Sequence, residues 1–316
     1  MKKIGLLCSG GDAPGINCYI RWIINNAPNY DLDICLIEEG FKGLYENKFI
    51  KTDFQKIEYS YYNGGTIIKT SRFCEFKNKK IQEVCVNNLL ANNIDTLIVV
   101  GGNGSYLAKN IIKNYNIRTI GIPETIDNNV ENTNFSLGFM TAVETVANSI
   151  KALKESAESH GRCYIIEIMG DKSGDLTKIA SISAKADICS TPEEKLSFEQ
   201  ITYKVLELIS KGKKSIIIAI TEKMHNSYEE LINLIHNKTK LLVRPYILGF
   251  IQRGGSPTAL ERYFAANLAL VTLKFIKNFK DSGDIGIEGI NNYSITSNKN
   301  KQIINLKNSD FFDLIK

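Results

Sequence analysis

Short apolar runs alternate with longer stretches of amphipathic, helix-like spacing along the chain. Seven apolar runs predict strands that are buried on both faces, at residues 3–8, 33–36, 95–100, 119–122, 164–168, 215–220 and 241–247. Six amphipathic stretches predict helices, at residues 16–25, 106–113, 140–156, 198–210, 227–237 and 259–278. Strands that alternate with helices are typical of βα units, so the pattern predicts an α/β fold with mostly parallel sheets.

The composition narrows the class of protein. The 316 residues are 43% hydrophobic and include 14 Tyr and 14 Phe, enough apolar material for a sizeable core. The length fits two domains or one large one, and no proline-rich or low-complexity linker marks a boundary. No apolar run approaches the ~20 residues that span a bilayer. Because the apolar stretch at residues 4–8 is too short for a secretory signal, we expect a cytoplasmic protein without membrane association.

Charge and cysteine usage argue against other classes. Lys and Arg number 39 against 34 Asp and Glu, so the net charge is +5, and no long basic run predicts nucleic acid as a partner. The seven Cys are odd in number, form no CxxC pair and lie mostly in apolar strings, which predicts reduced core thiols. The three His are too scattered for a zinc site.

Glycine-rich loops follow two of the predicted strands. Residues 9–15 (SGGDAPG) come after the first strand, and residues 101–105 (GGNGS) come after the strand at 95–100. Ligands of parallel sheets bind at the carboxyl ends of strands, where glycine permits close backbone approach and helix N-termini attract phosphate. Two such loops indicate a polyphosphate ligand. The alternatives are a tight strand–helix turn for the first loop and helix capping for Asn103 and Ser105.

Charged residues follow other predicted strands. Thr125 and Asp127 come after the strand at 119–122 and suit a positioning group beside a general base; the alternative is an Asx-turn formed by Asp127. Arg253 precedes a glycine pair, which suits an anion clamp. Arg72, Arg162 and Arg244 are further isolated arginines near loops. Together they favour phosphorylated ligands.

Taken together, these strings resemble the bacterial type of the ATP-dependent 6-phosphofructokinase family, and the resemblance is to a divergent member of it. The strings that carry the resemblance are residues 9–15, 64–66, 71–73, 101–105, 123–129, 167–170, 221–222 and 252–257, in the family's order and at nearly its spacing. The resemblance implies the phosphofructokinase fold, with two Rossmann-like three-layer lobes. Residues 1–138 plus 251–301 would form a nucleotide-binding lobe, and residues 139–250 plus 302–316 a sugar-phosphate lobe. It also implies a homotetramer whose active sites are completed by a neighbouring subunit.

The resemblance assigns roles to individual residues. Asp127 is the implied general base toward the 1-hydroxyl of fructose 6-phosphate, Thr125 holds the γ-phosphate region, and Arg72 stabilises charge in the transition state. The implied ATP site comprises Gly11, Arg72, Phe73, Gly102, Asn103, Gly104 and Ser105. The implied substrate site comprises Thr125, Ile126, Asp127, Arg162, Met169, Gly170, Glu222, Arg244 and Arg253. Within it, Arg253 binds the 6-phosphate, and Arg162 and Arg244 reach the same phosphate of the adjacent subunit.

An effector site is implied at Arg21, Lys154, Asp187, Lys211 and Lys213. Gly104 is the residue type that the family uses for ATP, whereas its pyrophosphate-using relatives carry a bulkier acid there. Mg²⁺ is the implied cofactor, with Asn103 as a weak ligand.

The chain departs from the family pattern at the implied active site. Asn103 and Asn129 stand where the family has Asp, Glu124 replaces a Gly, Asp171 replaces an Arg, and Phe250 replaces a His. Losing two acids near a hard cation should weaken the placement of Mg·ATP by several kcal/mol at an effective dielectric of ~20. The sequence shows no cation that offsets Asp171.

Three interpretations follow. The first is an ATP-dependent kinase that phosphorylates fructose 6-phosphate at O1 in glycolysis. The second is a catalytically impaired paralogue, acting as a regulatory or sugar-phosphate-binding subunit of a hetero-oligomer. The third is a kinase of the same fold for another sugar phosphate.

Overall fold

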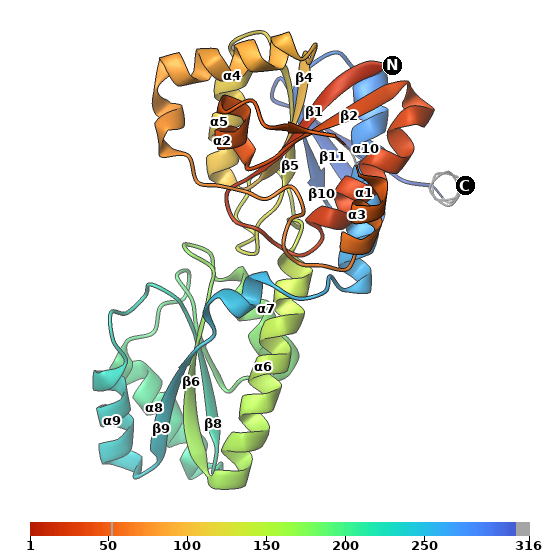
Figure 1. Cartoon of the computed structure of the whole chain (residues 1–316). Helices are drawn as coiled ribbons and strands as arrows, with labels where there is room; N and C mark the ends of the chain where they lie inside the picture. Colours follow the sequence, from red (N-terminus) through yellow and green to blue (C-terminus); the bar gives the residue numbers. More distant parts are fainter. Residues whose placement is uncertain (52, 308–316) are drawn as a thin grey trace. The chain divides into compact units, whose positions relative to one another are not determined.

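The computed structural model describes residues 1–51 and 53–307, and the chain separates into two compact units (Figure 1). Among the described residues, the first unit contains residues 1–125, 129–140 and 253–307, and the second contains residues 126–128 and 141–252. The chain therefore passes between the units more than once.

The first unit is built on an eight-stranded sheet in the order β12-β11-β10-β5-β4-β1-β2-β3. Its strands are β1 (Lys2–Ser9), β2 (Leu32–Ile37), β3 (Phe49–Ile50), β4 (Thr96–Gly101), β5 (Arg118–Pro123), β10 (Gly283–Ile287), β11 (Asn292–Ser297) and β12 (Asn300–Asn305). The five central strands pair in parallel, while β3 at one edge and β11 and β12 at the other pair antiparallel. The predicted parallel α/β architecture is confirmed for this centre.

Helices cover both faces of this sheet. They are α1 (Ile16–Asn26), α2 (Gly40–Tyr45), α3 (Phe54–Ser60), α4 (Lys79–Ala91), α5 (Asn103–Lys113) and α10 (Ala259–Asn278), with short 3₁₀ helices at Ala27–Tyr30 and Cys74–Lys77. Leu6 of β1 packs with α1 and α10, whereas Leu7 packs with α2 and α4 on the opposite face. Successive strand residues point to opposite faces, so an uninterrupted apolar strand is buried from both sides. On α5 the buried Lys109 is paired with Asp284 of β10.

The second unit has a four-stranded parallel sheet in the order β7-β8-β6-β9. Its elements are α6 (Phe139–His160), β6 (Arg162–Ile168), α7 (Asp175–Ala184), β7 (Ile188–Ser190), α8 (Phe198–Ser210), β8 (Ile216–Thr221), α9 (Glu229–Thr239), β9 (Leu242–Ile247) and a 3₁₀ helix at Gly249–Arg253. The first two residues of α6 and the last residue of the 3₁₀ helix belong to the first unit. One sheet face packs against α8 and α9. On the other face Tyr164 meets Ser156 of α6, and Thr221 meets Thr177 of α7.

Two expectations from the sequence are wrong. The strand at 241–247 was expected to be buried on both faces, but β9 is an edge strand and Ile247 is 70% exposed. Residues 302–307 were expected in the sugar-phosphate lobe, but β12 pairs with β11 in the sheet of the first unit. Apolar composition alone does not reveal the edge of a sheet; residues 308–316 lie outside the described part of the chain. Within that part, none of the helices has the length and apolar character that a bilayer crossing requires.

Candidate active site

The two glycine-rich loops lie side by side, at the carboxyl ends of the neighbouring strands β1 and β4. The Ser105 hydroxyl donates to the carbonyl oxygen of Ser9 at 2.7 Å. Gly101 has no room for a side chain, since a Cβ there would lie 2.3 Å from the same carbonyl oxygen. Gly10 has φ +99°, in the left-handed region that favours glycine. The two glycine-rich loops are therefore joined by a hydrogen bond at the carboxyl ends of their strands.

The capping alternative for Asn103 and Ser105 is wrong. Helix α5 begins at Asn103 after Gly102, and no side chain caps it. Ser105 is 3% exposed, with its hydroxyl on the first loop. The Asn103 amide instead donates to the backbone oxygen of Asn129 at 3.1 Å, and so links the second loop to the third.

Two glycines of these loops face different surroundings. A Cβ on Gly104 would meet nothing within 4 Å, so the space beside the first turn of α5 is open. A Cβ on Gly11 would lie 2.7 Å from Nη1 of Arg253. The Arg253 guanidinium thus packs against the backbone of the first loop, and the structure brings the first and fourth motifs together.

The segment with Arg72 and Phe73 is anchored beside the first loop. The Thr70 hydroxyl donates to the carbonyl oxygen of Gly10 at 3.0 Å, and the Ser71 hydroxyl donates to that of Glu39 at 2.7 Å. Phe73 packs against the ring of Tyr45 with centroids 5.7 Å apart, while Arg72 is exposed. The backbone is therefore held by side chains from its own segment, and the arginine is left in solvent.

The third loop is divided between the two units. In the first unit the Ser136 hydroxyl donates to the carbonyl oxygen of Thr125 at 2.7 Å. In the second unit Ile126 is 3% exposed, and Asp127 is half-buried. The side chain of Asn128 donates to Asp175 at 3.2 Å, which fixes the loop next to Asp127.

Glu124 is buried, at 2% exposure, in the first unit. Burial raises the pKa of the Cys8 thiol, and the nearby Glu124 carboxylate adds to that rise. Because Glu124 is enclosed, it does not present its carboxylate to solvent beside Thr125.

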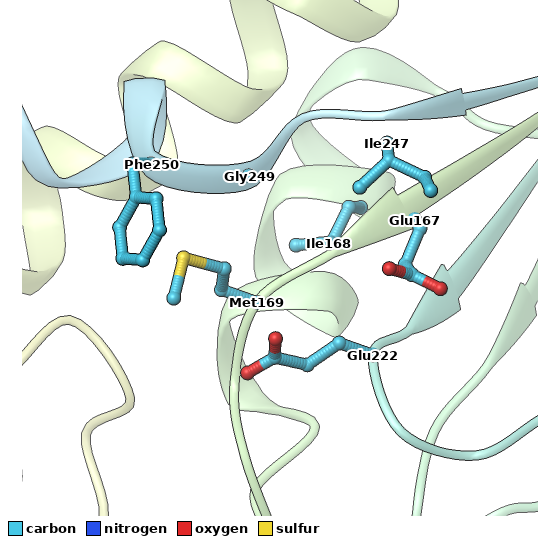
Figure 2. Close-up of a pocket in the computed structure, with 7 residues that line it drawn as sticks. All are labelled: Glu167, Ile168, Met169, Glu222, Ile247, Gly249 and Phe250. Carbon is cyan, nitrogen blue, oxygen red and sulfur yellow. The ribbon is translucent and has the colours of Figure 1, made fainter.

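A cavity of about 100 Å³ lies beyond the carboxyl ends of β6 and β8 in the second unit (Figure 2). It is lined by Glu167, Ile168, Met169, Glu222, Ile247, Gly249 and Phe250. Figure 2 shows the Met169 thioether between the Phe250 ring and the Glu222 carboxylate. Two residues implied for sugar binding, Met169 and Glu222, therefore share one cavity, with Phe250 at the position of the family's His.

The loop after β6 is organised by Glu222. The Oε1 atom of Glu222 accepts from the backbone N–H of Gly170 at 3.4 Å and from that of Asp171 at 3.2 Å. The N–H of Met169 donates to Gln252 at 3.1 Å. Gly170 must be glycine, because a Cβ would lie 2.3 Å from the carbonyl oxygen of Ser173.

Lys223 is a charged residue of this unit that the motifs did not reveal. Its Nζ lies 2.7 Å from Oδ1 of Asp171, 52 residues away in sequence. Both residues follow strand ends, which is the one sequence signal that could have drawn attention to Lys223.

Arg162 lies far from the cavity within one chain, whereas Arg244 lies three residues before Ile247, which lines it. Arg162 is the first residue of β6 and Met169 follows its last, so at about 3.3 Å per residue they are roughly 20 Å apart. Arg244 lies within the exposed edge strand β9, opposite Tyr164 of β6. One copy of the chain therefore does not bring Arg162 to its own Met169.

The residues implied for an effector site are engaged within the chain. Arg21 donates to both Glu58 oxygens, at 2.9 and 3.4 Å, and lies 4.6 Å from the ring centroid of Trp22. In the second unit Lys213 is paired with Asp187, Lys154 donates to the carbonyl oxygen of Lys185, and Lys211 pairs with Glu207. Burial and the neighbouring Lys154 lower the pKa of Lys213.

This arrangement defines an α/β protein with two phosphate-type glycine loops and a separate cavity lined by carboxylates. The family described as Phosphofructokinase matches residues 3–276. The chain is 38% identical over 307 residues to the ATP-dependent 6-phosphofructokinase of Buchnera aphidicola, covering 97% of this chain and 95% of that protein. The chain belongs to the phosphofructokinase family.

Solved structures share the fold. Phosphofructokinase from Saccharomyces cerevisiae superimposes with a TM-score of 0.85 at 22% identity; the match covers all of this chain and 45% of that longer one. A pyrophosphate-dependent phosphofructokinase from Marinobacter aquaeolei superimposes with a TM-score of 0.80 at 16% identity, covering 96% and 82% of the two chains. Because a phosphofructokinase named as pyrophosphate-dependent shares the fold, the fold alone does not select the phosphoryl donor.

Proposed function

We propose that the chain transfers the γ-phosphate of ATP to the 1-hydroxyl of fructose 6-phosphate, giving fructose 1,6-bisphosphate in glycolysis. The observation that carries this proposal is the pair of glycine loops joined between Ser105 and Ser9, with open space at Gly104. The relative at 38% identity that is named as ATP-dependent supports ATP as the donor.

Each functional group has one task in the proposed reaction. Asp127 accepts the proton of the 1-hydroxyl as that oxygen attacks the γ-phosphorus. The bond between the γ-phosphorus and the β–γ bridging oxygen breaks, and ADP leaves. Thr125 positions the γ-phosphate, and the solvent-exposed Arg72 is free to swing toward the developing charge. Glu222 holds the sugar through the loop it organises.

Mg²⁺ fits this site as an ion carried by the nucleotide. Residues 1–51 and 53–307 contain no group of three His, Cys, Asp or Glu side chains placed to hold a metal. Mg²⁺ commonly binds through phosphates and waters with few protein ligands, and when bound it neutralises phosphate charge. The Asn103 amide nitrogen is used on Asn129, so Asn103 would offer the ion only its carbonyl oxygen.

We further propose a homotetramer with shared active sites, acting in the cytoplasm. The placement of Arg162 away from the cavity of its own chain supports sharing, because its guanidinium group suits the 6-phosphate of a neighbouring subunit. The seven free thiols fit a reducing compartment.

The test is turnover by the purified full chain with fructose 6-phosphate, ATP and Mg²⁺, with the product's phosphorylation site assigned by phosphorus NMR. D127N should lower kcat by about 10²–10⁴-fold, because a positioned base contributes that much. D33N removes a carboxylate from an exposed position of β2 and should leave kcat unchanged. Failure to form the 1,6-bisphosphate, or faster turnover of another sugar phosphate, refutes the proposal.

A further inference from the structure

Asp171 and Lys223 form an ion pair beside the sugar cavity that the motif pattern does not explain. Asp171 follows β6 and Lys223 follows β8, and these strands are neighbours in the second sheet. Both residues have left-handed backbone, with φ 53° and 62°. Left-handed backbone is unfavourable for non-glycine residues, so two such residues facing each other mark a specific local geometry.

Stability does not account for this pair. The side chains are 64% exposed at Lys223 and 41% exposed at Asp171, and ion pairs in water contribute little to folding. The backbone of Asp171 is nevertheless fixed on the site, because its N–H donates to Oε1 of Glu222 at 3.2 Å.

The surroundings of the Lys223 ammonium are acidic. Its hydrogen bond to Asp171 raises the pKa of Lys223, and the charges of Glu222, Asp171 and Asp127 add to this rise. The hydrogen bond from Lys223 lowers the pKa of Asp171, and the charges of Lys223 and Lys172 add to this effect. On α7, Asp175 carries its own partner Lys178 at 2.9 Å.

The carboxylates of Asp127, Asp171 and Glu222 would repel a sugar phosphate and the phosphoryl group that it receives. The resemblance implies an Arg at position 171, where this chain has an acid. Lys223 returns a positive charge to the same place from the neighbouring strand end, which is the offset that the sequence did not show.

We propose that Lys223 is a positioning residue of the phosphoryl-transfer site, held by Asp171 and acting through Glu222 and Asp127. Its ammonium offsets their charge, so that an anionic substrate approaches and the base stays ionised. This inference rests on the proposed function.

The test compares K223M, K223R and D171N with wild type. K223M should raise KM for fructose 6-phosphate about tenfold and move the acid limb of the kcat/KM profile to higher pH, because losing a nearby cation favours the protonated form of the base. K223R keeps the charge and should restore both values to within about threefold. D171N keeps Lys223 but removes its ion-pair partner, so KM for fructose 6-phosphate should change less in D171N than in K223M.

K2M is the matched control, because Lys2 and Asp95 form an ion pair at 3.0 Å with side-chain exposures of 45% and 63%. It should change neither KM nor the pH profile. A K223M enzyme that matches K2M overturns the inference and leaves the proposed function standing. Equal losses in K223M and K223R with a lowered melting temperature also overturn it, because that result describes a structural role. A wild-type chain without turnover refutes the proposed function, and this inference with it.

Discussion

Gly104→Asp is the sharpest test of where the nucleotide lies. Gly104 is the second residue of α5, and a Cβ there would meet nothing within 4 Å. The protein itself should tolerate the change. An acid in the first turn of a helix stabilises it by about 0.3–1 kcal/mol, and the helix propensity of Asp exceeds that of Gly by only about 0.3 kcal/mol. The free energy of unfolding should therefore stay the same or rise by about 1 kcal/mol.

ATP binding should suffer strongly from the same change. A carboxylate placed ~4 Å from a phosphate charge costs roughly 4 kcal/mol at an effective dielectric of ~20. At about 1.4 kcal/mol per tenfold, KM for ATP should rise by about a thousandfold. Steady-state kinetics with ATP, together with thermal unfolding of the same preparations, separates this loss from misfolding.

Gly104→Asn is the matched control, since it fills the same space without a charge. It should raise KM for ATP much less than G104D does. If G104D and wild type bind ATP equally well, the open space at Gly104 is not the nucleotide site, and the argument from the glycine loops fails. Equal losses in G104D and G104N would refute the electrostatic part of the reasoning and leave only the steric part.

Three further changes test the surrounding structure. G11A places a Cβ 2.7 Å from the end of the flexible Arg253 side chain, so it should displace the guanidinium. KM for fructose 6-phosphate should then rise several-fold, with little loss of melting temperature. An unchanged KM would show that Arg253 does not contribute to substrate binding. N103D removes an exposed hydrogen bond but adds an acid to the first turn of α5, so the free energy of unfolding should change by less than about 1 kcal/mol. N103D with N129D should lower the Mg²⁺ concentration needed for half-maximal rate, and if activity does not rise, the missing acids do not limit this enzyme. D284N leaves the buried Lys109 of α5 without its charge partner, so the free energy of unfolding should fall by about 3–5 kcal/mol, as measured with denaturant. A fall below about 1 kcal/mol would contradict a tight ion pair.

Local pattern was enough to predict much of the framework. Helices α8 and α10 have the predicted bounds, and each of the seven predicted strands is present with its ends within two residues. The pattern did not predict α4 or α7, nor the strands β10–β12. Strands β10–β12 contain Gly, Asn and Lys residues, so the alternation of apolar and polar residues that marks a strand is weak there.

The candidate site shows the same division. Glycine and charged residues directly after strands could be recognised, because parallel strands place their carboxyl ends at one edge of the sheet. That Ser105 bonds to the first loop rather than capping its helix could not be predicted, since both uses suit a serine at that position. The Lys223–Asp171 pair could not be predicted either, because 52 residues separate its members.

The sequence by itself therefore determined the α/β pattern, the strand-end loops and the residue types that phosphate chemistry needs. The tertiary structure decided that β9 is an edge strand, that β12 completes the first sheet, that Arg253 lies on Gly11, and that Lys223 faces Asp171. The physical reason is the distance along the sequence over which each kind of interaction acts. Periodicity and turn chemistry act within a few residues, whereas strand order and charge pairing depend on which distant segments the folded core brings together.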